Sequence, residues 1–513
     1  MRFALLYDNR FMQPALLENF RDYILATEPD TEYDVLIRWG NVNGQDQSAS
    51  VIFNRKQPLK NCFDKATVFE ILRINRIRRP HLIIPQPDSK YPLIGKFFET
   101  GGTQRDPVIT DFAEAQRIKA DFYVECINTV KKYNLYIFDH NIFCITKKMA
   151  VRTHTGPGGG VPKWAYEEIP GDIDQDVQKV SRLAIRAMHA LGLDFGMVHA
   201  GLDTRGRAII LDVTPTPVMT ERLAGLFRWQ VDNFLNRNSP ENPVDYRPEQ
   251  PGAANNTVLL GADPEFMLRD TISHKIIYPS DFLDREGILG YDERSENREG
   301  QYFPLAEIRP EPDPCPIRLT EKIRDILGRA AKLIPPHIEW LGGSLHFEQY
   351  QIGGHIHLSN ISISSRLLRV LDNYLAIPIM LIEDPVSGSL RRRQYGWLGS
   401  IRSKPHGGFE YRTPASWLVS PEMTRGCLCL AKIVVTEHPS LSKDFFTSPE
   451  MQKAFYQSKK HLFYDIFYEL WEDITATYHY GIYATNLAPI YNLIHSRSHW
   501  DENVDLRKTW GLI

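Results

Sequence analysis

A proline-rich segment near the middle of the chain limits what it can fold into. From Leu235 to Asn256 the sequence reads LNRNSPENPVDYRPEQPGAANN, with four prolines, many polar residues and no apolar period. Such a composition favours an extended linker and cannot bury one face against a core. A chain of 513 residues also exceeds one ordinary hydrophobic core. We therefore predict two domains, residues 1–235 and 257–513, joined by a linker at 236–256.

Both predicted domains mix strand-like and helix-like segments. In the N-terminal half, apolar and β-branched runs predict strands, and 176–191 carries an apolar helical face that ends at Gly192, a residue suited to a helix C-cap. In the C-terminal half, 319–330 predicts a helix that ends before Pro335. Residues 421–513 are rich in aromatic side chains and are predicted to be helical. These patterns indicate an α+β protein of two domains.

Composition and charge exclude several classes of protein. The chain has 60 basic and 63 acidic residues, and the net charge of −3 argues against general nucleic-acid binding, which depends on neutralising phosphates. No apolar stretch reaches the roughly 20 residues of a membrane span. Six scattered cysteines without a CxxC pair indicate a reduced, cytoplasmic protein. The opening MRFALLYDNRF predicts a strand and not a signal peptide.

Four short stretches of the C-terminal half each place two polar residues two positions apart between apolar neighbours. In GADPEFML, LAEIRPEP, GGHIHLS and GFEYRTPAS the pairs are Asp263 with Glu265, Glu307 with Arg309, His355 with His357, and Glu410 with Arg412. Residues i and i+2 of a strand share a face, so each stretch predicts a strand that presents its pair on one face. The opposite face is predicted to pack through Phe266, Ile308, Ile356 and Tyr411.

Several carboxylates on one sheet face indicate a metal site, because buried charges pair or bind metals. The predicted ligands are Glu265, Glu307, His355 and Glu410. A mostly oxygen site suits Mg²⁺ or Mn²⁺, whereas zinc favours nitrogen and sulfur, so a zinc hydrolase centred on the two histidines is the alternative. Nearby arginines add groups that grip phosphates, as phosphoryl transfer requires. The double glycine before His355 is predicted to let substrate or nucleotide approach the strand closely.

These stretches, together with YGWLGSIRSKPHGGFEYRTPASW, resemble the carboxylate–amine ligases of the glutamine synthetase superfamily. More narrowly, they resemble its amidoligase type 2 group of phages and bacteria, over roughly residues 257–420. The resemblance implies a curved antiparallel sheet with helices that holds ATP and two or three Mg²⁺ or Mn²⁺ ions. It also implies that a carboxylate attacks the γ-phosphate of ATP and that an amine then attacks the acyl phosphate.

Carried over residue by residue, the resemblance implies metal ligands and catalytic cations. The metal ligands would be Glu265, Glu307, His355 and Glu410, and Asp263 and His357 would lie beside them in the metal site. The catalytic residues, which would hold phosphates or the substrate carboxylate, would be Arg309, Arg402 and Arg412. Members of the superfamily form rings, so the resemblance also allows a homo-oligomer.

The N-terminal half carries a phosphate-binding pattern of its own. In YPLIGKFFETGGTQRDPVI, Lys96 ends a predicted strand, and Gly101 and Gly102 follow it. A lysine followed by a flexible glycine loop can hold nucleotide phosphates. Farther on, DFYVECIN contributes Glu125, and DFGMVHAGLDTRGRAIILDVTPTPVM predicts two strands joined by a turn, the second of which contains Asp212.

In this order the N-terminal pieces resemble an ATP-grasp domain over roughly residues 1–230. The resemblance implies ATP contacts through Lys96, Gly101, Gly102, Glu125, and Lys147 or Lys148, with Asp212 as a metal ligand. Four positions depart from the family. Thr214 replaces the Asn of a Glu-x-Asn metal motif, His199 replaces an acidic metal ligand, and Lys132 with Asn134 replaces a Glu–aromatic–Arg segment. The losses put the catalytic competence of this half in question.

The leading hypothesis is an enzyme with two ATP-dependent ligase modules that form amide bonds on one small molecule or peptide. A second hypothesis keeps one active ligase, in the C-terminal half, beside a degenerate nucleotide-binding module. A third is a nucleotide-binding regulatory protein without catalysis. ATP and Mg²⁺ or Mn²⁺ are the predicted cofactors, and the partners are a carboxylate and an amine whose identities the residues do not give.

Overall fold

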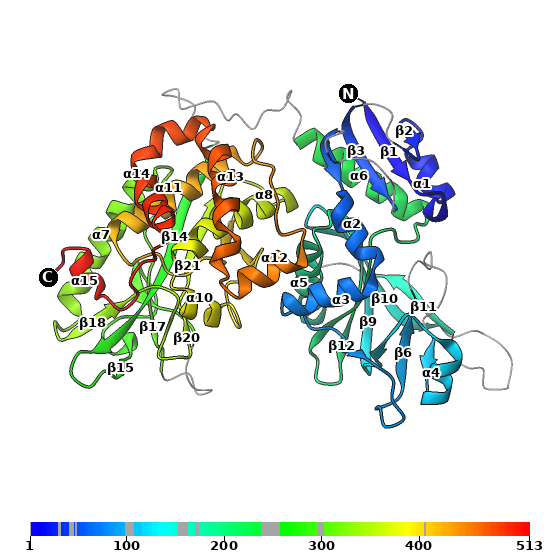
Figure 1. Ribbon diagram of the computed structural model, residues 1–513, viewed down its shortest axis with the longest axis horizontal. Coiled ribbons are helices and arrows are strands. Elements are labelled where there is room, and N and C mark those ends of the chain that lie inside the picture. Colours follow the sequence, from blue (N-terminus) through cyan, green and yellow to red (C-terminus); the bar gives the residue numbers. More distant parts are fainter. Residues whose placement is uncertain are drawn as a thin grey trace. The chain divides into compact units, whose positions relative to one another are not determined.

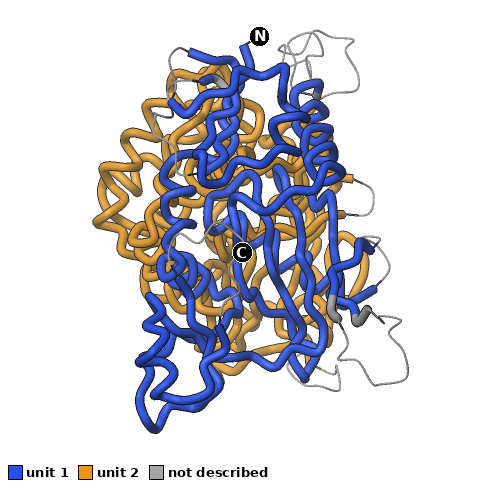
Figure 2. Tube along the Cα trace, turned by 90° about the vertical axis from the view of Figure 1, so that its right-hand side faces the viewer, with its two compact units in different colours: residues 1–243 blue, residues 244–513 orange. Residues whose placement is uncertain are grey.

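The computed structural model describes residues 2–28, 32–40, 46, 49–97, 107–151, 163–169, 174–237, 257–294, 302–404 and 407–513. The chain forms two compact units, residues 1–243 and 244–513, coloured blue and orange in Figure 2. The point that divides the units falls inside the segment predicted as a linker. Within the described ranges, no helix combines the length and the apolar character needed to cross a membrane.

Unit 1 begins with a small parallel sheet. Its strands are β1 (Phe3–Tyr7), β2 (Ile24–Ala26), β3 (Tyr33–Trp39) and β4 (Ala49–Phe53), in the order β2-β1-β3-β4. Around them lie α1 (Pro14–Asn19), α2 (Lys56–Phe63) and α6 (Glu221–Arg237) (Figure 1). The core of this part is aromatic, and Phe227 of α6 stacks on Phe195 with 4.1 Å between ring centroids. The predicted first strand is confirmed.

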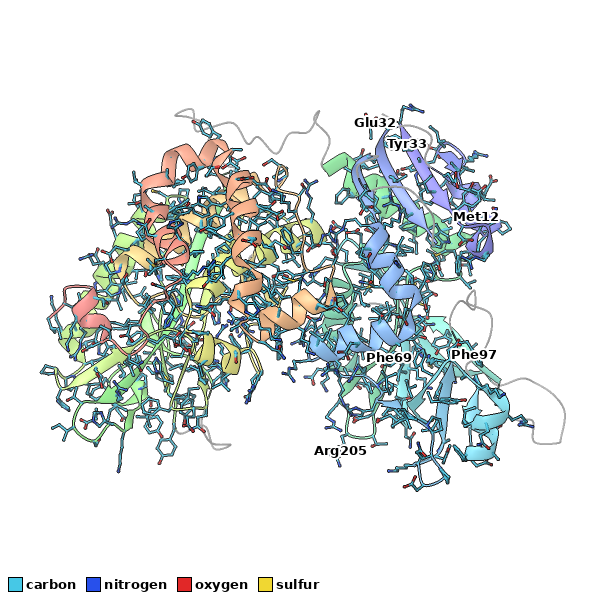
Figure 3. The ribbon with its side chains drawn as sticks, in the orientation of Figure 1. Met12, Glu32, Tyr33, Phe69, Phe97 and Arg205 are labelled. Carbon is cyan, nitrogen blue, oxygen red and sulfur yellow. The ribbon has the colours of Figure 1, made fainter. Side chains whose placement is uncertain are left out.

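The second sheet of unit 1 is antiparallel and has five strands. They are β11 (Lys163–Glu168), β10 (Asn141–Val151), β9 (Thr129–Phe138), β12 (Phe195–Asp203) and β13 (Ala208–Thr214), in that order. Arg205 lies in the turn between β12 and β13 (Figure 3). Helices α3 (Lys65–Ile74) and α5 (Gln175–Leu191) pack on one face of this sheet through an apolar core. The predicted helix is α5, and Gly192 caps it with φ of 68°, as the sequence indicated.

The third sheet of unit 1 carries the predicted lysine. It consists of β5 (Leu82–Ile83), β8 (Phe122–Glu125), β6 (Leu93–Lys96) and β7 (Val108–Ile109), in that order, followed by α4 (Phe112–Ile118). Phe69 of α3 contacts this sheet through the Phe122 ring, with 6.1 Å between centroids (Figure 3). Lys96 ends β6, which confirms its predicted place at the end of a strand.

Unit 2 is built on one antiparallel sheet of eight strands. Six of them run in the order β16 (Leu289–Tyr291), β17 (Leu305–Ile308), β14 (Leu259–Asp270), β21 (Gly354–Ser359), β23 (Phe409–Tyr411) and β22 (Ile401–Ser403). Two more, β15 (Ile276–Ile277) and β18 (Ile338–Leu341), pair with β14, and β19 (Leu345–His346) and β20 (Tyr350–Gln351) form a separate hairpin. The four predicted strands are β14, β17, β21 and β23, so all four are confirmed.

Helices make up the rest of unit 2. They are α7 (Pro316–Leu333), α8 (Ser365–Val370), a π-helical turn (Leu371–Ala376), α9 (Ile377–Ile382), α10 (Pro385–Arg391), α11 (Pro421–Glu437), α12 (Pro449–Tyr456), α13 (Tyr464–Thr475), α14 (Tyr478–His495) and α15 (Leu506–Thr509). Short 3-10 segments lie at Asn9–Phe11 in unit 1 and at Pro279–Asp281 and Lys460–Leu462 in unit 2. The predicted packing residues of the sheet, Phe266, Ile308, Ile356 and Tyr411, are buried. The predicted helices at 319–330 and over 421–513 are confirmed.

Candidate active site

The strand register of unit 2 places the predicted polar pairs on one face of the sheet. The cross-strand pairs are Asp263–His355, Glu265–Glu307, His357–Glu410 and Arg402–Glu410. Paired residues and residues two apart share a face, so these side chains converge over β17, β14, β21, β23 and β22. The face contains one cluster of carboxylates, imidazoles and cations, as the sequence predicted.

Asp263, His357 and Glu410 form the one group in the described part of the chain whose ligand atoms could hold a metal ion together. One such atom of each residue lies within 4.8 Å of the other two. His357 Nε2 is 3.0 Å from Asp263 Oδ1 and 4.0 Å from Glu410 Oε2. Burial alone would raise the pKa of both carboxyl groups. Neighbouring imidazoles and, at Glu410, cations outweigh it and hold both pKa values below their usual range.

The donor set of this group fits a divalent cation. Two carboxylates and one imidazole are ligands that Mg²⁺ and Mn²⁺ accept. Glu265 Oε1 is buried and makes no hydrogen bond of acceptable geometry to any described residue. A buried polar atom without a hydrogen bond is costly, so this oxygen points to a ligand between the strands. Asp263, His357 and Glu410 are therefore the residues that would hold a metal here.

Glu265 and Glu307 face each other on β14 and β17 with an arginine beside each. Arg294 forms an ion pair with Glu265, and Arg309 forms one with Glu307. Glu265 also accepts a hydrogen bond of 2.7 Å from the backbone N–H of Gly353. Burial, followed by the nearby Asp263 carboxylate, raises the pKa of Glu307 to about 9. Such crowding of carboxyl groups is what a bound cation relieves.

His355 is buried between the carboxylate group and Tyr395. Its Nδ1 lies 3.0 Å from Asp263 Oδ1 and 3.3 Å from Glu410 Oε1, and its Nε2 lies 2.7 Å from the Tyr395 hydroxyl. In the neutral ring the proton belongs on Nδ1, because two carboxylate oxygens face that nitrogen. Nε2 then accepts a hydrogen bond from Tyr395. The structure thus places His355 beside the Asp263, His357 and Glu410 group, where it orients Asp263.

Tyr395 links His355 to the arginines of the site. Its oxygen accepts a hydrogen bond of 2.5 Å from Arg412, a residue that can only donate, so the hydroxyl proton is free for His355. The guanidinium groups of Arg294, Arg391 and Arg412 lie over its ring at 5.0, 5.2 and 5.1 Å from the centroid. The sequence reasoning missed Tyr395 and Arg294. Tyr395 opens a stretch that carried the family resemblance, but no spacing distinguished it.

The two glycines before His355 serve a purpose that differs from the prediction. A Cβ atom on Gly353 would lie 2.1 Å from His355 Nε2, and one on Gly354 would lie 2.2 Å from the carbonyl oxygen of Ala415. The space beside both glycines is filled by the protein itself. The prediction that they admit substrate or nucleotide is therefore wrong, and Gly353 instead leaves room for the imidazole ring.

Cations surround Glu410, which is fully buried. Arg402 Nε and Lys404 Nζ lie 2.7 and 2.9 Å from its Oε2, and Arg412 Nε lies 3.0 Å from its Oε1. Across the whole face, carboxyl groups lie beside cations: Asp263, Glu265, Asp292, Glu307 and Glu410 lie among Arg294, Arg309, Arg402, Lys404 and Arg412. A face with groups of both signs can contact both divalent cations and phosphate oxygens.

In unit 1 the structure gathers some of the predicted residues and separates others. Lys96 Nζ lies 2.9 Å from Asp212 Oδ2. Lys148 pairs with Tyr166 of β11, whose hydroxyl is 3.2 Å from His199 Nε2, so Lys148 lies on the same face as His199. Lys147 is the neighbouring residue of the strand and faces the other way.

Two further predictions concern the third sheet of unit 1 and the loop after it. Glu125 ends β8, with Oε2 4.0 Å from His81 Nε2. The predicted glycine loop, Gly101 and Gly102, lies outside the described residues.

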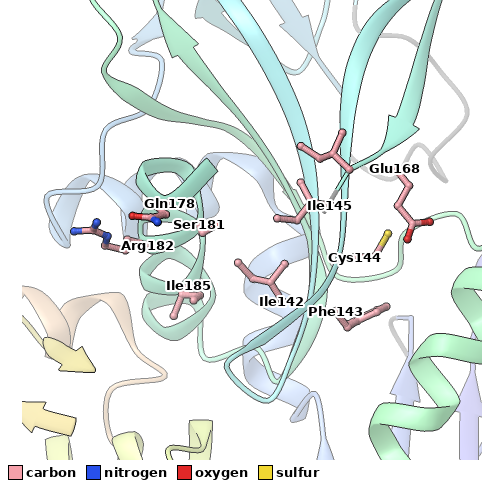
Figure 4. A pocket seen from close by; sticks show the side chains of 10 residues that line it. Ile142, Phe143, Cys144, Ile145, Glu168, Gln178, Ser181, Arg182 and Ile185 are labelled. Atoms are coloured by element: carbon pink, nitrogen blue, oxygen red, sulfur yellow. The ribbon is translucent and has the colours of Figure 1, made fainter. Parts of the chain in front are cut away.

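The surroundings of Asp212 do not fit a divalent cation. Its Oδ1 lies 2.8 Å from Lys65 Nζ and its Oδ2 contacts Lys96, so an ammonium group already neutralises each oxygen. A hollow of about 500 Å³ lies on the α5 side of β10, lined by isoleucines together with Gln178 and Arg182 (Figure 4). Its lining offers Glu168 as a single carboxylate, which is no metal site.

Residues 260–512 match one ligase family. Its description is Phage phiEco32-like COOH.NH2 ligase-type 2. The match confirms the resemblance of the C-terminal half to the amidoligase type 2 group, and with it the ligase class that the sequence predicted. The matched region contains every residue of the site in unit 2. None of the curated proteins matches the sequence.

Solved structures with similarity to the chain include ATP-grasp ligases. D-alanine–D-alanine ligase from Bacillus anthracis is 13% identical, with 47% of this chain and 99% of that chain covered and a TM-score of 0.35. The ATP-grasp ligase PsnB, complexed with a minimal precursor, is 11% identical over 45% and 99%, with a TM-score of 0.34. The RimK domain protein ATP-grasp from Sphaerobacter thermophilus is 16% identical over 44% and 98%, with a TM-score of 0.31.

Proposed function

We propose that unit 2 joins a carboxylate to an amine at the expense of ATP. The observation that supports this most strongly is the shared face that holds the Asp263, His357 and Glu410 group, with arginine and lysine side chains beside it. Carboxylates that can hold divalent cations, next to cations that can hold phosphates, are what phosphoryl transfer needs. The family match supports the same class of reaction.

In the proposed reaction, the substrate carboxylate attacks the γ-phosphorus of ATP. The bond to the β,γ-bridging oxygen breaks, and an acyl phosphate and ADP form. The amine then attacks the acyl carbon, phosphate leaves, and the amine gives up one proton. A divalent cation held by Asp263, His357 and Glu410 would supply charge neutralisation for phosphate oxygens. Arg309, Arg402 and Arg412 would bind phosphate or the substrate carboxylate, and their fixed charges would stabilise the charge that moves during transfer.

Hydroxylamine tests the proposal without knowledge of the natural amine. The purified protein is incubated with ATP, Mg²⁺ or Mn²⁺, hydroxylamine and a panel of amino acids, dicarboxylates and acidic peptides. We expect a hydroxamate and an equal amount of ADP with at least one carboxylate, because hydroxylamine intercepts an activated carboxyl group. Glu410→Gln should abolish both products. Glu422→Gln, on an exposed turn of α11 outside the site, is the control and should not.

Other outcomes would favour the competing functions. One tightly held zinc ion per chain with hydrolysis that needs no ATP would overturn the proposal in favour of a zinc hydrolase. Tight ATP binding without any turnover would favour a regulatory protein. The two-module alternative predicts an ATP turnover that survives Glu410→Gln and disappears in Lys96→Met. The poor fit of the Asp212 surroundings to a divalent cation favours a single active unit.

A further inference from the structure

The π-helical turn Leu371–Ala376 of unit 2 buries three consecutive polar residues. Asp372, Asn373 and Tyr374 are each at most 2% exposed. Pro378 of α9 has no N–H to donate to the carbonyl oxygen of Tyr374, so a regular α-helix is interrupted at this point. Because π-helical turns are frequent at functional sites, the contacts of these three side chains are informative.

Asp372 contacts two segments that lead directly into the site of unit 2. Its Oδ1 accepts a hydrogen bond of 2.7 Å from the Tyr411 hydroxyl and one of 2.9 Å from the backbone N–H of Gly399. Burial, followed by the charge of Asp372, raises the pKa of the Tyr411 hydroxyl, so this group keeps its proton and is the donor. Asp372 is thus held by β23 and by the turn before β22 at the same oxygen.

Tyr411 connects Asp372 to the site from the packed face of the sheet. It lies between Glu410 and Arg412, so its side chain points to the face opposite theirs. Tyr411 is fully buried, and its hydroxyl is the polar end of a ring packed under the sheet. A displacement of Tyr411 would therefore move Glu410 and Arg412, because the three residues share one short stretch of backbone.

Gly399 extends the contact of Asp372 to the neighbouring strand β22. Its φ of 62° lies in the region that glycine favours, in the turn that precedes this strand. After the turn, the backbone N–H of Arg412 donates a hydrogen bond of 2.8 Å to the carbonyl oxygen of Ser400, and Arg402 pairs with Glu410 across the two strands. One carboxylate oxygen therefore contacts both strands of this edge of the site.

We infer that Asp372 is a positioning residue, which acts through Tyr411 and Gly399 to hold the β22 and β23 edge of the site in place. Burial of a carboxylate is costly, and an apolar side chain would pack in the same space without that cost. Both printed hydrogen bonds of Asp372 go to the segments that carry site residues, so the cost serves their placement. This role rests on the function proposed for unit 2, because Asp372 itself lies outside the site.

Substitution of Asp372 in the full chain tests the inference. Asp372→Leu removes the acceptor at similar size, whereas Asp372→Asn keeps an oxygen in the position of Oδ1. Hydrogen–deuterium exchange of peptides over 397–404 and 409–413, measured by mass spectrometry, reports on the two strands without metal or substrate. We expect exchange to be about tenfold faster in Asp372→Leu, with Mn²⁺ affinity about tenfold lower, and Asp372→Asn to stay close to the unsubstituted protein.

Tyr374→Phe is the matched control from the same π-helical turn. The Tyr374 hydroxyl donates to Asp473 at 2.6 Å and accepts from the backbone N–H of Lys443 at 3.0 Å, and neither residue belongs to the site. Its loss should lower stability while exchange in the two peptides and Mn²⁺ affinity stay unchanged. If Asp372→Leu and Tyr374→Phe behave alike, Asp372 has a purely structural role and the inference is overturned.

The remaining outcomes also decide the question. If Asp372→Leu does not fold, Tyr411→Phe removes the same 2.7 Å hydrogen bond from the donor side and is measured in the same way. Faster exchange with unchanged Mn²⁺ affinity would overturn the inference. If the unsubstituted protein forms no hydroxamate, the proposed function fails, whereas exchange and Mn²⁺ binding still decide the role of Asp372.

Discussion

Removing the Tyr395 hydroxyl while keeping its ring tests whether the chain from Arg412 through Tyr395 and His355 to Asp263 supports catalysis. Tyr395→Phe retains the ring that lies under three guanidinium groups. It removes two hydrogen bonds, one of 2.5 Å from Arg412 and one of 2.7 Å to His355 Nε2. His355 Nε2 is then a buried acceptor without a donor, and its imidazole loses the contact that fixes its proton on Nδ1.

The size of the effect follows from these two bonds. A buried polar group left without a partner costs about 1–3 kcal/mol, and His355 is only 1% exposed. We expect the free energy of unfolding of unit 2 to fall by about 2 kcal/mol. Loss of the groups that orient metal ligands typically costs about 10–100-fold in metal affinity or activity. We therefore expect Mn²⁺ affinity and ATP-dependent turnover to fall by that factor.

The assay measures free Mn²⁺ by electron paramagnetic resonance during titration of the protein, alongside hydroxamate formation at saturating Mn²⁺. Tyr478→Phe is the control, because Tyr478 is 60% exposed on α14. A purely structural role for Tyr395 would lower stability and leave Mn²⁺ affinity unchanged. That result, or an unchanged turnover at saturating Mn²⁺, would refute the reasoning.

Three further predictions test separate parts of the structure. Gly353→Ala should reduce turnover as Tyr395→Phe does, because the new Cβ would lie 2.1 Å from His355 Nε2 and would displace the ring. Gly328→Ala is the control, since nothing lies within 4 Å of a Cβ at that position. Equal activity of the two variants would contradict the prediction. Arg391→Met should lower the free energy of unfolding of unit 2 by about 3 kcal/mol, because Arg391 is buried and donates hydrogen bonds to three backbone carbonyl oxygens. Urea unfolding followed by tryptophan fluorescence measures this loss, and an unchanged urea midpoint would refute the prediction. Burial, followed by His189, lowers the pKa of His140 to about 3, so the unfolded chain binds the extra proton and unit 1 should lose stability as pH falls from 6.5 toward 3. His140→Asn, which tolerates the φ of 70°, should reduce the slope, and an equal slope in both proteins would exclude this cause.

The sheet of unit 2 could be predicted from the sequence because its signal is local. A polar pair two residues apart with apolar neighbours is the pattern of a strand with one packed face, and each of β14, β17, β21 and β23 shows it. The joint occurrence of carboxylates on these strands then indicated one cluster. Local sequence patterns also located Lys96 at the end of a strand and α5 with its Gly192 cap.

The parts that the sequence did not reveal depend on contacts between distant segments. Tyr395 follows α10 and reaches His355 across 40 positions of sequence, and Arg294 reaches Glu265 across 29. Neither residue has a periodic neighbour that marks it. Lys147 and Lys148 could not be distinguished until the register of β10 with β11 was known. Gly353 was misread because the sequence cannot tell whether a ligand or a side chain of the protein fills the space beside a glycine.

The two units handle charge in opposite ways, and this difference separates their roles. In unit 2, carboxyl groups and cations share one face, so a divalent cation and phosphate oxygens each find groups of opposite charge there. In unit 1, an ammonium group already lies beside each oxygen of Asp212, so a divalent cation is disfavoured there. Removal of divalent metal, or the Glu410→Gln substitution, should therefore stop ATP turnover altogether. A protein with two active ligase units would instead keep part of its ATP turnover in Glu410→Gln.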